Sequence, residues 1–212
     1  MTDGIRLDGR IAVVTGAAGV IGTETIKLLA ARGARIVAVD RDTGALQRAV
    51  AELPASAEAL ALTADVTSEE DVIGYIAATV KRFGTIDIFY NNAGIEGTIA
   101  PIVKASLADF RRVLDVNVVG VFLGMKHVLP VMLKANKGSI INTASIAGVI
   151  GSAEIAVYSP SLIPISEPTR LPSLSYAGFC LKKKKRDLRH HECSQSSYIA
   201  SRYRRDSVFS LQ

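Results

Sequence analysis

The sequence shows no long apolar run, and we expect no secretory signal from its first residues. No apolar run reaches the roughly 20 residues of a membrane-spanning helix. The N-terminus has no basic region followed by an apolar core, as a secretory signal would. We therefore expect no membrane partner and a cytoplasmic location. With 212 residues, 49% of them hydrophobic, the chain can form one domain with a sizeable core and is too apolar to be disordered.

The first three quarters of the chain have no cysteine and almost no net charge. Residues 1–159 contain no cysteine and carry 15 basic and 16 acidic side chains, a balance of −1. Residues 160–212 contain Cys180 and Cys193 and carry 10 basic and 4 acidic side chains, a balance of +6. The change in composition predicts a boundary after Tyr158, with a domain at 1–159 and a tail at 160–212.

Short apolar runs alternate with helix-like segments from Arg10 to Asn142. This alternation predicts an α/β fold, a Rossmann-like doubly wound parallel sheet with helices on both faces, truncated at its C-terminal side. Ligands of such sheets bind beyond the carboxyl ends of the strands, where the strand order reverses. The predicted strands are 11–15, 35–39, 59–63, 86–90 and 138–143, and the predicted helices are about 20–32, 43–52, 68–83 and 106–135.

Two of these helices begin with a serine that is followed by an acid three residues later. Ser68 precedes Asp71, and Ser106 precedes Asp109. This spacing is typical of a capping box, in which the two side chains bond to the free N–H groups of the first helical turn. The pairs therefore predict where both helices start.

A glycine-rich turn follows the first strand. Glycine has no Cβ, so the backbone can approach a phosphate closely, and the N-terminus of the next helix offers free N–H groups to the same anion. Glycine-rich turns are also plain connections between elements, and the pattern alone does not separate these two interpretations. The candidate cofactor-binding residues of the turn are Thr15, Gly16, Gly19, Val20, Ile21 and Gly22.

An acid ends the second strand. Asp40 lies 18 residues after Gly22, where a carboxylate can accept hydrogen bonds from the 2′- and 3′-hydroxyls of a ribose. The same carboxylate would repel a 2′-phosphate, which favours NAD over NADP. Arg41 follows immediately and partly offsets that preference.

Six motifs in order resemble the short-chain dehydrogenase/reductase family over residues 6–159. One departure concerns the turn, since the family has its middle glycine where this chain has Val20, and a glycine lies one place earlier at Gly19. We expect weaker cofactor binding from this change. The motifs are Thr15-Gly16 with Gly22, Asp65-Val66, Asn91-Asn92-Ala93-Gly94, Asn117, Ser145 and Tyr158.

The resemblance implies further cofactor contacts. Asp65 and Val66 would contact the adenine ring, although an aspartate capping a turn before the third helix explains Asp65 equally well. Asn92, Ala93 and Gly94 would stabilise the sheet and line the cofactor pocket. No metal site is predicted.

The resemblance also implies a catalytic set. Tyr158 would act as the acid or base at the substrate oxygen, Ser145 would polarise the substrate carbonyl, and Asn117 would hold a water in a proton relay. Asn117 has an alternative explanation, an amide satisfied by nearby backbone. Glu96 is interpreted as an exposed loop acid.

The family's lysine, which lowers the tyrosine pKa and holds the nicotinamide ribose, is missing. Its position, one helical turn after Tyr158, is Leu162, and no lysine occurs between Lys137 and Lys182. Proline recurs every four residues here and costs about 3 kcal/mol inside a helix, so the helix cannot continue. The prolines are Pro160, Pro164, Pro168 and Pro172.

The end of the chain looks foreign to the family. Residues 161–185 resemble a translated sequencing-library adapter that runs into a poly-A read. We expect residues from about 160 onward to be irregular and not a natural continuation. The alternative for 182–205 is a basic tail that binds nucleic acid or a membrane surface, but basic runs are more often merely solvated, and no nucleic-acid partner is predicted.

Together the motifs predict an NAD-dependent oxidoreductase that transfers a hydride between NAD(H) and a secondary alcohol or ketone. Activity is expected to be impaired because of Leu162. The alternatives are a dinucleotide-binding module without catalysis and an inactive chimeric fragment. The predicted partner is a small alcohol or ketone. The family forms homo-oligomers through the long helix and the one after it, and we expect that assembly to be impaired here.

Overall fold

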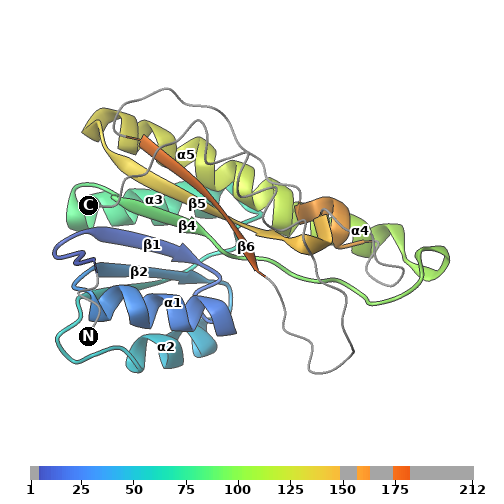
Figure 1. Cartoon of the computed structure of the whole chain (residues 1–212), viewed down its shortest axis with the longest axis horizontal. Coiled ribbons are helices and arrows are strands. Elements are labelled where there is room, and N and C mark those ends of the chain that lie inside the picture. The colour runs from blue at the N-terminus through green and yellow to red at the C-terminus, as the bar shows by residue number, and fades with distance from the viewer. Residues whose placement is uncertain (1–4, 149–156, 163–173, 182–212) are drawn as a thin grey trace, which may run out of the picture. The chain divides into compact units, whose positions relative to one another are not determined.

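The computed structural model describes residues 5–148, 157–162 and 174–181. Its strands form one sheet in the order β3-β2-β1-β4-β5-β6, with every neighbouring pair parallel (Figure 1). The order reverses between β1 and β4, so the fold is the doubly wound, Rossmann-like sheet that the sequence predicts. The strands are β1 (Ile11–Thr15), β2 (Arg35–Asp40), β3 (Ala59–Thr63), β4 (Ile88–Asn91), β5 (Gly138–Ser145) and β6 (Leu174–Leu181).

Helices cover both faces of this sheet. In Figure 1, α1 and α2 lie on one side, and α3 and α5 lie on the other. The α-helices are α1 (Val20–Ala31), α2 (Thr43–Ala51), α3 (Glu69–Phe83), α4 (Leu107–Leu114) and α5 (Gly120–Ala135). The shorter elements are the 3-10 turns η1 (Ile102–Lys104), η3 (Ile146–Gly148) and η4 (Ser159–Leu162), and the π-helical turn η2 (Asp115–Val119).

Each face of the sheet has its own hydrophobic core, because successive strand residues point to opposite faces. Along β1, Ile11 and Val13 pack with residues of α3 and α5, whereas Ala12 and Val14 pack with residues of α1 and α2. All four are buried. The strand is therefore apolar throughout, as a parallel strand buried on both faces must be.

The predicted serine caps are confirmed, but the reciprocal half of each capping box is not formed by the acid. The Ser68 hydroxyl accepts from the Asp71 N–H at 3.3 Å, while the Asp71 carboxylate accepts from the N–H of Asp65 at 2.8 Å. Ser106 caps α4 at the N–H of Asp109 in the same way. The acids are used instead to hold the loops in front of their helices.

One helix, at 107–135, is long and apolar enough to cross a membrane, although no single apolar run in the sequence reaches that length. Leu107–Ala135 is 29 residues long with a hydropathy of 1.7 over its most apolar window, so its length and composition would suffice to cross a membrane. The helix contacts α3, β4 and β5, and core helices of soluble proteins pass the same test. Polar residues such as Asn117 interrupt it, which is why no uninterrupted apolar run marks it in the sequence.

The expectation of irregular structure after residue 160 is wrong for two short segments. Residues 159–162 form η4, and Leu174–Leu181 forms β6, which pairs in parallel with β5 over its whole length. The segment 174–181 has no proline, and six of its residues are aliphatic, aromatic or cysteine, so it meets the requirements of a strand. The adapter-like composition hid this pattern.

Asp87 ties the amino-terminal ends of three strands together. Its side chain is 6% exposed and accepts from the backbone N–H of Ile11 at 3.0 Å, from Arg10 at 3.0 Å and from Lys137 at 2.8 Å. Burial raises the pKa of this carboxyl, but the bonds from Lys137, Ile11 and Arg10 outweigh it, so the pKa lies below its ordinary value.

Replacing Asp87 by asparagine should lower the free energy of unfolding by about 1–3 kcal/mol at pH 7. The amide keeps an acceptor for the Ile11 N–H but loses both cationic partners. A lowered folded-state pKa stabilises above the unfolded value of about 3.9, and this contribution is lost as the pH falls through the folded pKa. Urea unfolding should therefore show the two proteins converging below pH 4, roughly. Glu24→Gln, in an exposed pair with Lys27, should have a far smaller effect; equal losses would contradict the assignment.

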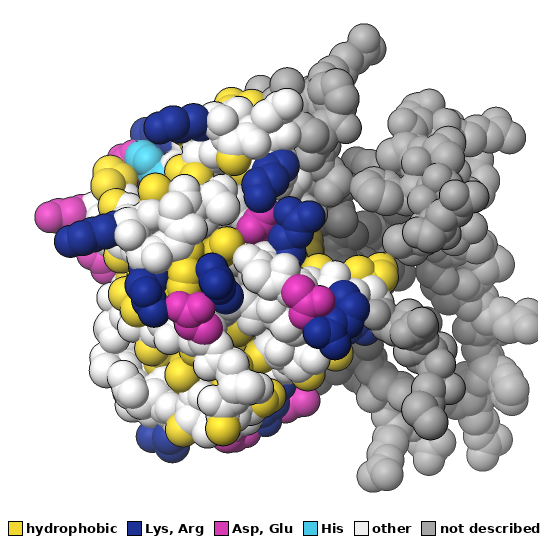
Figure 2. Space-filling model, turned by 90° about the vertical axis from the view of Figure 1, so that its left-hand side faces the viewer, with side chains coloured by type: hydrophobic (Ala, Val, Ile, Leu, Met, Phe, Trp, Pro, Cys, Tyr) yellow, Lys and Arg dark blue, Asp and Glu magenta, His cyan; other side chains and the backbone are white. Residues whose placement is uncertain are grey.

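On the face shown in Figure 2, acidic and basic side chains lie interspersed. Glu58, for example, bridges Arg35 and Arg82, and Glu69 bonds to both Lys126 and His127. This mixture agrees with the near-neutral balance of residues 1–159. The basic run at 182–205 lies outside the described residues.

Candidate functional site

The turn after β1 is packed so closely that only glycine fits at two positions. Gly16 has a φ of +63°, and a Cβ there would lie 2.8 Å from the Cα of Ala93. A Cβ on Gly22 would overlap the carbonyl oxygen of Gly16 and lie 2.7 Å from the Cα of Ala17. Close approach thus fixes both glycines, whereas a Cβ on Gly19 would meet nothing closer than 3.4 Å.

Thr15 and Asn92 hold the turn from behind. The Thr15 hydroxyl accepts from the backbone N–H groups of Asn92 at 3.1 Å and Ala93 at 3.2 Å. The Asn92 amide donates to the carbonyl oxygens of Thr15 and Gly16, both at 3.1 Å. These four bonds join the carboxyl ends of β1 and β4 at the point where the strand order reverses.

Asp40 reaches the same turn from β2. Its Oδ2 accepts from the backbone N–H of Ala18 at 3.0 Å, and its Oδ1 accepts from that of Asp42 at 3.1 Å. The carboxylate is therefore held rigidly beside the glycine-rich turn. Gly16 and Asp40 line one pocket, and Asn92 lies behind the turn, bonded to the Gly16 carbonyl.

The N-terminus of α1 is left open. Side chains cap α2, α3 and α4, but Gly19 at the start of α1 provides no side-chain cap. The first-turn N–H groups and the positive end of the helix dipole thus face the turn unopposed. Val20 and Ile21 stand at this end, and Val20 is 86% exposed, so the residue that departs from the family pattern projects from the helix start.

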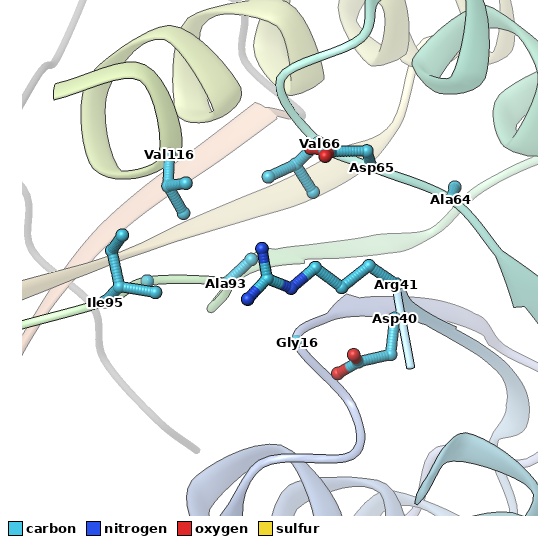
Figure 3. A pocket seen from close by; sticks show the side chains of 10 residues that line it. Gly16, Asp40, Arg41, Ala64, Asp65, Val66, Ala93, Ile95 and Val116 are labelled. Carbon is cyan, nitrogen blue, oxygen red and sulfur yellow. The ribbon is translucent and has the colours of Figure 1, made fainter. Parts of the chain in front are cut away.

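One pocket lies in front of these elements (Figure 3). The Arg41 side chain extends across it, between Asp40 on one side and Asp65 with Val66 on the other. Sequence reasoning named most of the lining and missed three apolar residues that each adjoin a named motif. The pocket is lined by Gly16, Asp40, Arg41, Asp65, Val66, Ala93 and Gly94, and by the three that were missed, Ala64, Ile95 and Val116.

Asp65 caps a turn and also lines the pocket, and its contact with an adenine ring stays a prediction. One carboxylate oxygen accepts from the backbone N–H and the hydroxyl of Thr67, both at 2.8 Å, and so caps the turn before α3. Asp65 also lines the pocket together with Val66. The turn bonds fix this carboxylate at the rim opposite Asp40.

Asn117 sits in the π-helical turn η2 and is 6% exposed. Its amide accepts from the N–H of Ile95 and donates to the carbonyl of Ile95, both at 2.9 Å. It also donates to the hydroxyl of Ser161 at 2.9 Å. The amide is therefore satisfied locally, as the structural alternative expected, and π-helical turns are frequent at functional sites.

Ser145 and Tyr158 come together at the carboxyl end of β5. Burial raises the pKa of Tyr158 above its ordinary value, the hydrogen bond with the Ser145 side chain lowers it, and the negative charge of Glu96 raises it again, with a net increase. The Ser145 hydroxyl also accepts from the N–H of Ala147 at 3.2 Å. The two hydroxyls that the sequence pairs are hydrogen-bonded.

The lysine that would ionise Tyr158 has no replacement among the described residues. Leu162 ends η4, four residues after Tyr158. Within the described part of the chain, Glu96 is the one charged side chain that shifts the pKa of Tyr158, and it acts against ionisation.

The chain resembles known dehydrogenases over about three quarters of its length. Residues 10–166 match the family described as short chain dehydrogenase. Levodione reductase from Leifsonia aquatica is 36% identical over 180 residues, covering 84% of this chain and 67% of the relative. (+)-Borneol dehydrogenase 2 from Salvia officinalis is 40% identical over 158 residues, covering 74% and 56%.

Solved structures agree with these relatives. The crystal structure of NAD+-bound xylitol dehydrogenase superposes with a TM-score of 0.73 at 42% identity, covering 74% of this chain and 61% of that one. The matched region thus spans little more than half to two thirds of the relatives. On its sequence motifs, its sheet topology and these matches, this chain belongs to the short-chain dehydrogenase family of oxidoreductases.

Proposed function

We propose that this chain binds NAD(H) in the pocket between the glycine-rich turn and the loop after β4. The carrying observation is the convergence of Gly16, Asp40 and Ala93 on one pocket, with the uncapped start of α1 beside it. Gly16 and Gly22 let the backbone approach a pyrophosphate, and the α1 N–H groups can receive it. The NAD+-bound xylitol dehydrogenase, with the same fold, supports the cofactor class.

Asp40 would bind the adenosine ribose hydroxyls and disfavour a 2′-phosphate, so NAD is proposed over NADP. Asp65 and Val66 would flank the adenine from the far rim, with Arg41 over it. Val20 and Ile21 would present their N–H groups to the pyrophosphate, and Gly19, whose own N–H donates to the Gly16 carbonyl at 3.2 Å, would shape the turn beside it. Asn92, Ala93 and Gly94 would continue the pocket towards the reacting end. The exposed side chain of Val20 should weaken the affinity.

The proposed parent reaction interconverts a secondary alcohol and a ketone. Bound NAD(H) would supply or accept the hydride. Ser145 would donate a hydrogen bond to the substrate oxygen, and Tyr158, bonded to Ser145, would give or take its proton. Asn117 would hold the loop at Ile95 and carry the water of the proton relay.

We further propose that this activity is impaired. A tyrosine acts as a base only when its phenol can ionise, and burial together with Glu96 raises the pKa of Tyr158. Leu162 cannot supply the opposing charge. The domain 1–159 is proposed as the functional unit in the cytoplasm, with the turn η4 packed against η2 and β5 at its end. The rest of the tail at 160–212 is proposed to be foreign to the family, and oligomer formation is expected to be weak.

NADH fluorescence titration, with excitation at wavelengths where tyrosine does not absorb, tests the binding step; the chain has six tyrosines and no tryptophan. NADH should bind, and NADPH should bind about tenfold more weakly, a difference of about 1.4 kcal/mol. Asp40→Asn keeps an acceptor for the Ala18 N–H but removes the charge, so it should narrow that ratio. No binding of either nucleotide would refute the proposal and favour an inactive fragment.

Turnover separates an enzyme from a binding module. The panel should pair NADH with the ketone levodione, and NAD+ with the alcohols borneol and xylitol, the compounds named for the relatives. NADH binding with little or no turnover is the expected outcome. Oxidation of NADH by levodione, or reduction of NAD+ by either alcohol, at an ordinary enzyme rate would contradict the proposed impairment.

A further inference from the structure

We propose that Ser161 is a positioning residue that holds Tyr158 in place through Asn117. This role deepens the proposed function and rests on it, since Tyr158 and Asn117 are its proposed catalytic groups. The sequence motifs single out the residues on either side of Ser161, at 158 and 162, and leave Ser161 without a role.

The Ser161 hydroxyl makes two hydrogen bonds, one to Tyr158 nearby and one to a distant part of the chain. The backbone N–H of Ser161 also donates to the Tyr158 carbonyl at 3.1 Å, a bond that Ser161→Ala keeps, so the link to Asn117 is the one that the substitution removes. The hydroxyl donates to the carbonyl oxygen of Tyr158 at 2.7 Å and accepts from the Asn117 amide at 2.9 Å. The residue is 3% exposed, so water does not compete freely for either bond. One hydroxyl thus connects η4 to the π-helical turn η2, 44 residues away in sequence.

The connection continues to the pocket. Asn117 also holds the backbone of Ile95 on both sides, with bonds of 2.9 Å to its N–H and its carbonyl, and Ile95 lines the pocket. Loosening Ser161 would therefore free the main chain of Tyr158 from the pocket wall. The position one turn after Tyr158 holds Leu162 and not a lysine, and Pro160 lies inside η4, so this bond provides an anchor that a continuous helix would otherwise give.

The expected consequence is a change at the phenol, not only in stability. The hydrogen bond from Ser145 lowers the pKa of Tyr158. That bond requires the phenol to stay beside Ser145, the last residue of β5. When Ser161→Ala releases the main chain, the Ser145 bond should be lost, and the pKa of Tyr158 should rise.

Ultraviolet titration of the full chain measures this directly, with the Tyr158→Phe protein subtracted to isolate one of the six tyrosines. Ser145→Ala and Ser161→Ala should each raise the midpoint of Tyr158, and the double variant should lie no higher than the single ones. The proposal is overturned if Ser161→Ala leaves the titration midpoint of Tyr158 unchanged, and if Ser145→Ala raises that midpoint equally in the parent chain and in the Ser161→Ala chain.

Two further variants keep the test decisive. Ser68→Ala removes a hydroxyl that caps α3, so it costs stability away from the site and should leave the Tyr158 midpoint unchanged. If Ser161→Ala does not fold, Ser161→Cys keeps a weak donor of similar size and should raise the midpoint in the same direction; no shift in that variant also overturns the proposal. NADH affinity should stay unchanged in the serine variants, so failure of cofactor binding and failure of the Ser161 role are separate outcomes.

Discussion

Replacing Gly22 by alanine should weaken NADH binding by about 100-fold or more, which corresponds to about 2.8 kcal/mol. A single Cβ at this position overlaps the carbonyl oxygen of Gly16 and comes within 2.7 Å of the Cα of Ala17. Both contacts are with backbone, which cannot rotate away as a side chain can. The turn must therefore open, and overpacking of this kind costs about 1–3 kcal/mol in its own right.

Gly19→Ala is the matched control for this loss. It adds the same methyl group three residues earlier, where the nearest atom would be the Gly16 carbonyl oxygen at 3.4 Å and the backbone φ of −72° suits any residue. It should keep NADH affinity within about threefold, roughly 0.6 kcal/mol. Fluorescence titration and thermal unfolding would both be measured. Equal losses in the two variants would show that close packing at Gly22 does not explain the effect.

Five strands and the glycine-rich turn could be predicted from the sequence because local rules determine them. Buried parallel strands need apolar runs, and the turn needs glycine where backbones touch, as at Gly16 and Gly22. The start of β4 at Ile88 was placed two residues early, since Ile86 is buried and apolar like a strand residue. The strands and the turn are thus determined by the residue types of a few neighbouring positions, which the sequence shows directly.

Other features depend on contacts that sequence spacing does not encode. The long helix contains the π-helical turn around Asn117, and no periodicity distinguishes one widened turn from a regular helix. Asp71 matches a capping box but bonds to the N–H of Asp65, because the loop competes for the carboxylate. Ser161 carries no pattern at all, and its importance follows only from which groups lie within 3 Å of it.

The tail shows a different limit. Prolines every four residues exclude a helix after Tyr158, and this inference agrees with the short 3-10 turn η4. The same prolines do not exclude a strand in the proline-free segment after Pro172, and Leu174–Leu181 forms a strand that pairs with β5. A mostly apolar segment of eight residues beside an unpaired strand edge is enough to add to a sheet, whatever the origin of the sequence.

Replacing Leu162 by lysine should raise NADH-dependent ketone reduction by about 100-fold or more over the parent chain. The residue lies one turn after Tyr158, at the end of η4, where an ammonium group would favour the phenolate. Burial and the negative charge of Glu96 both oppose ionisation of Tyr158. Among the described residues, the hydrogen bond from Ser145 is the one interaction that favours it. A lysine at this position would supply a positive charge that favours the phenolate, so the pKa of Tyr158 should fall.

Leu162→Met is the control for this gain, since it changes the shape of the side chain without adding charge. It should leave turnover and the Tyr158 titration as they are in the parent. Adding Tyr158→Phe to the lysine variant should remove the gained activity while NADH still binds. If the lysine and methionine variants are equally inactive although both bind NADH, the missing charge is not the limiting defect. The cause would then lie in the third of the relatives' length that this chain does not match.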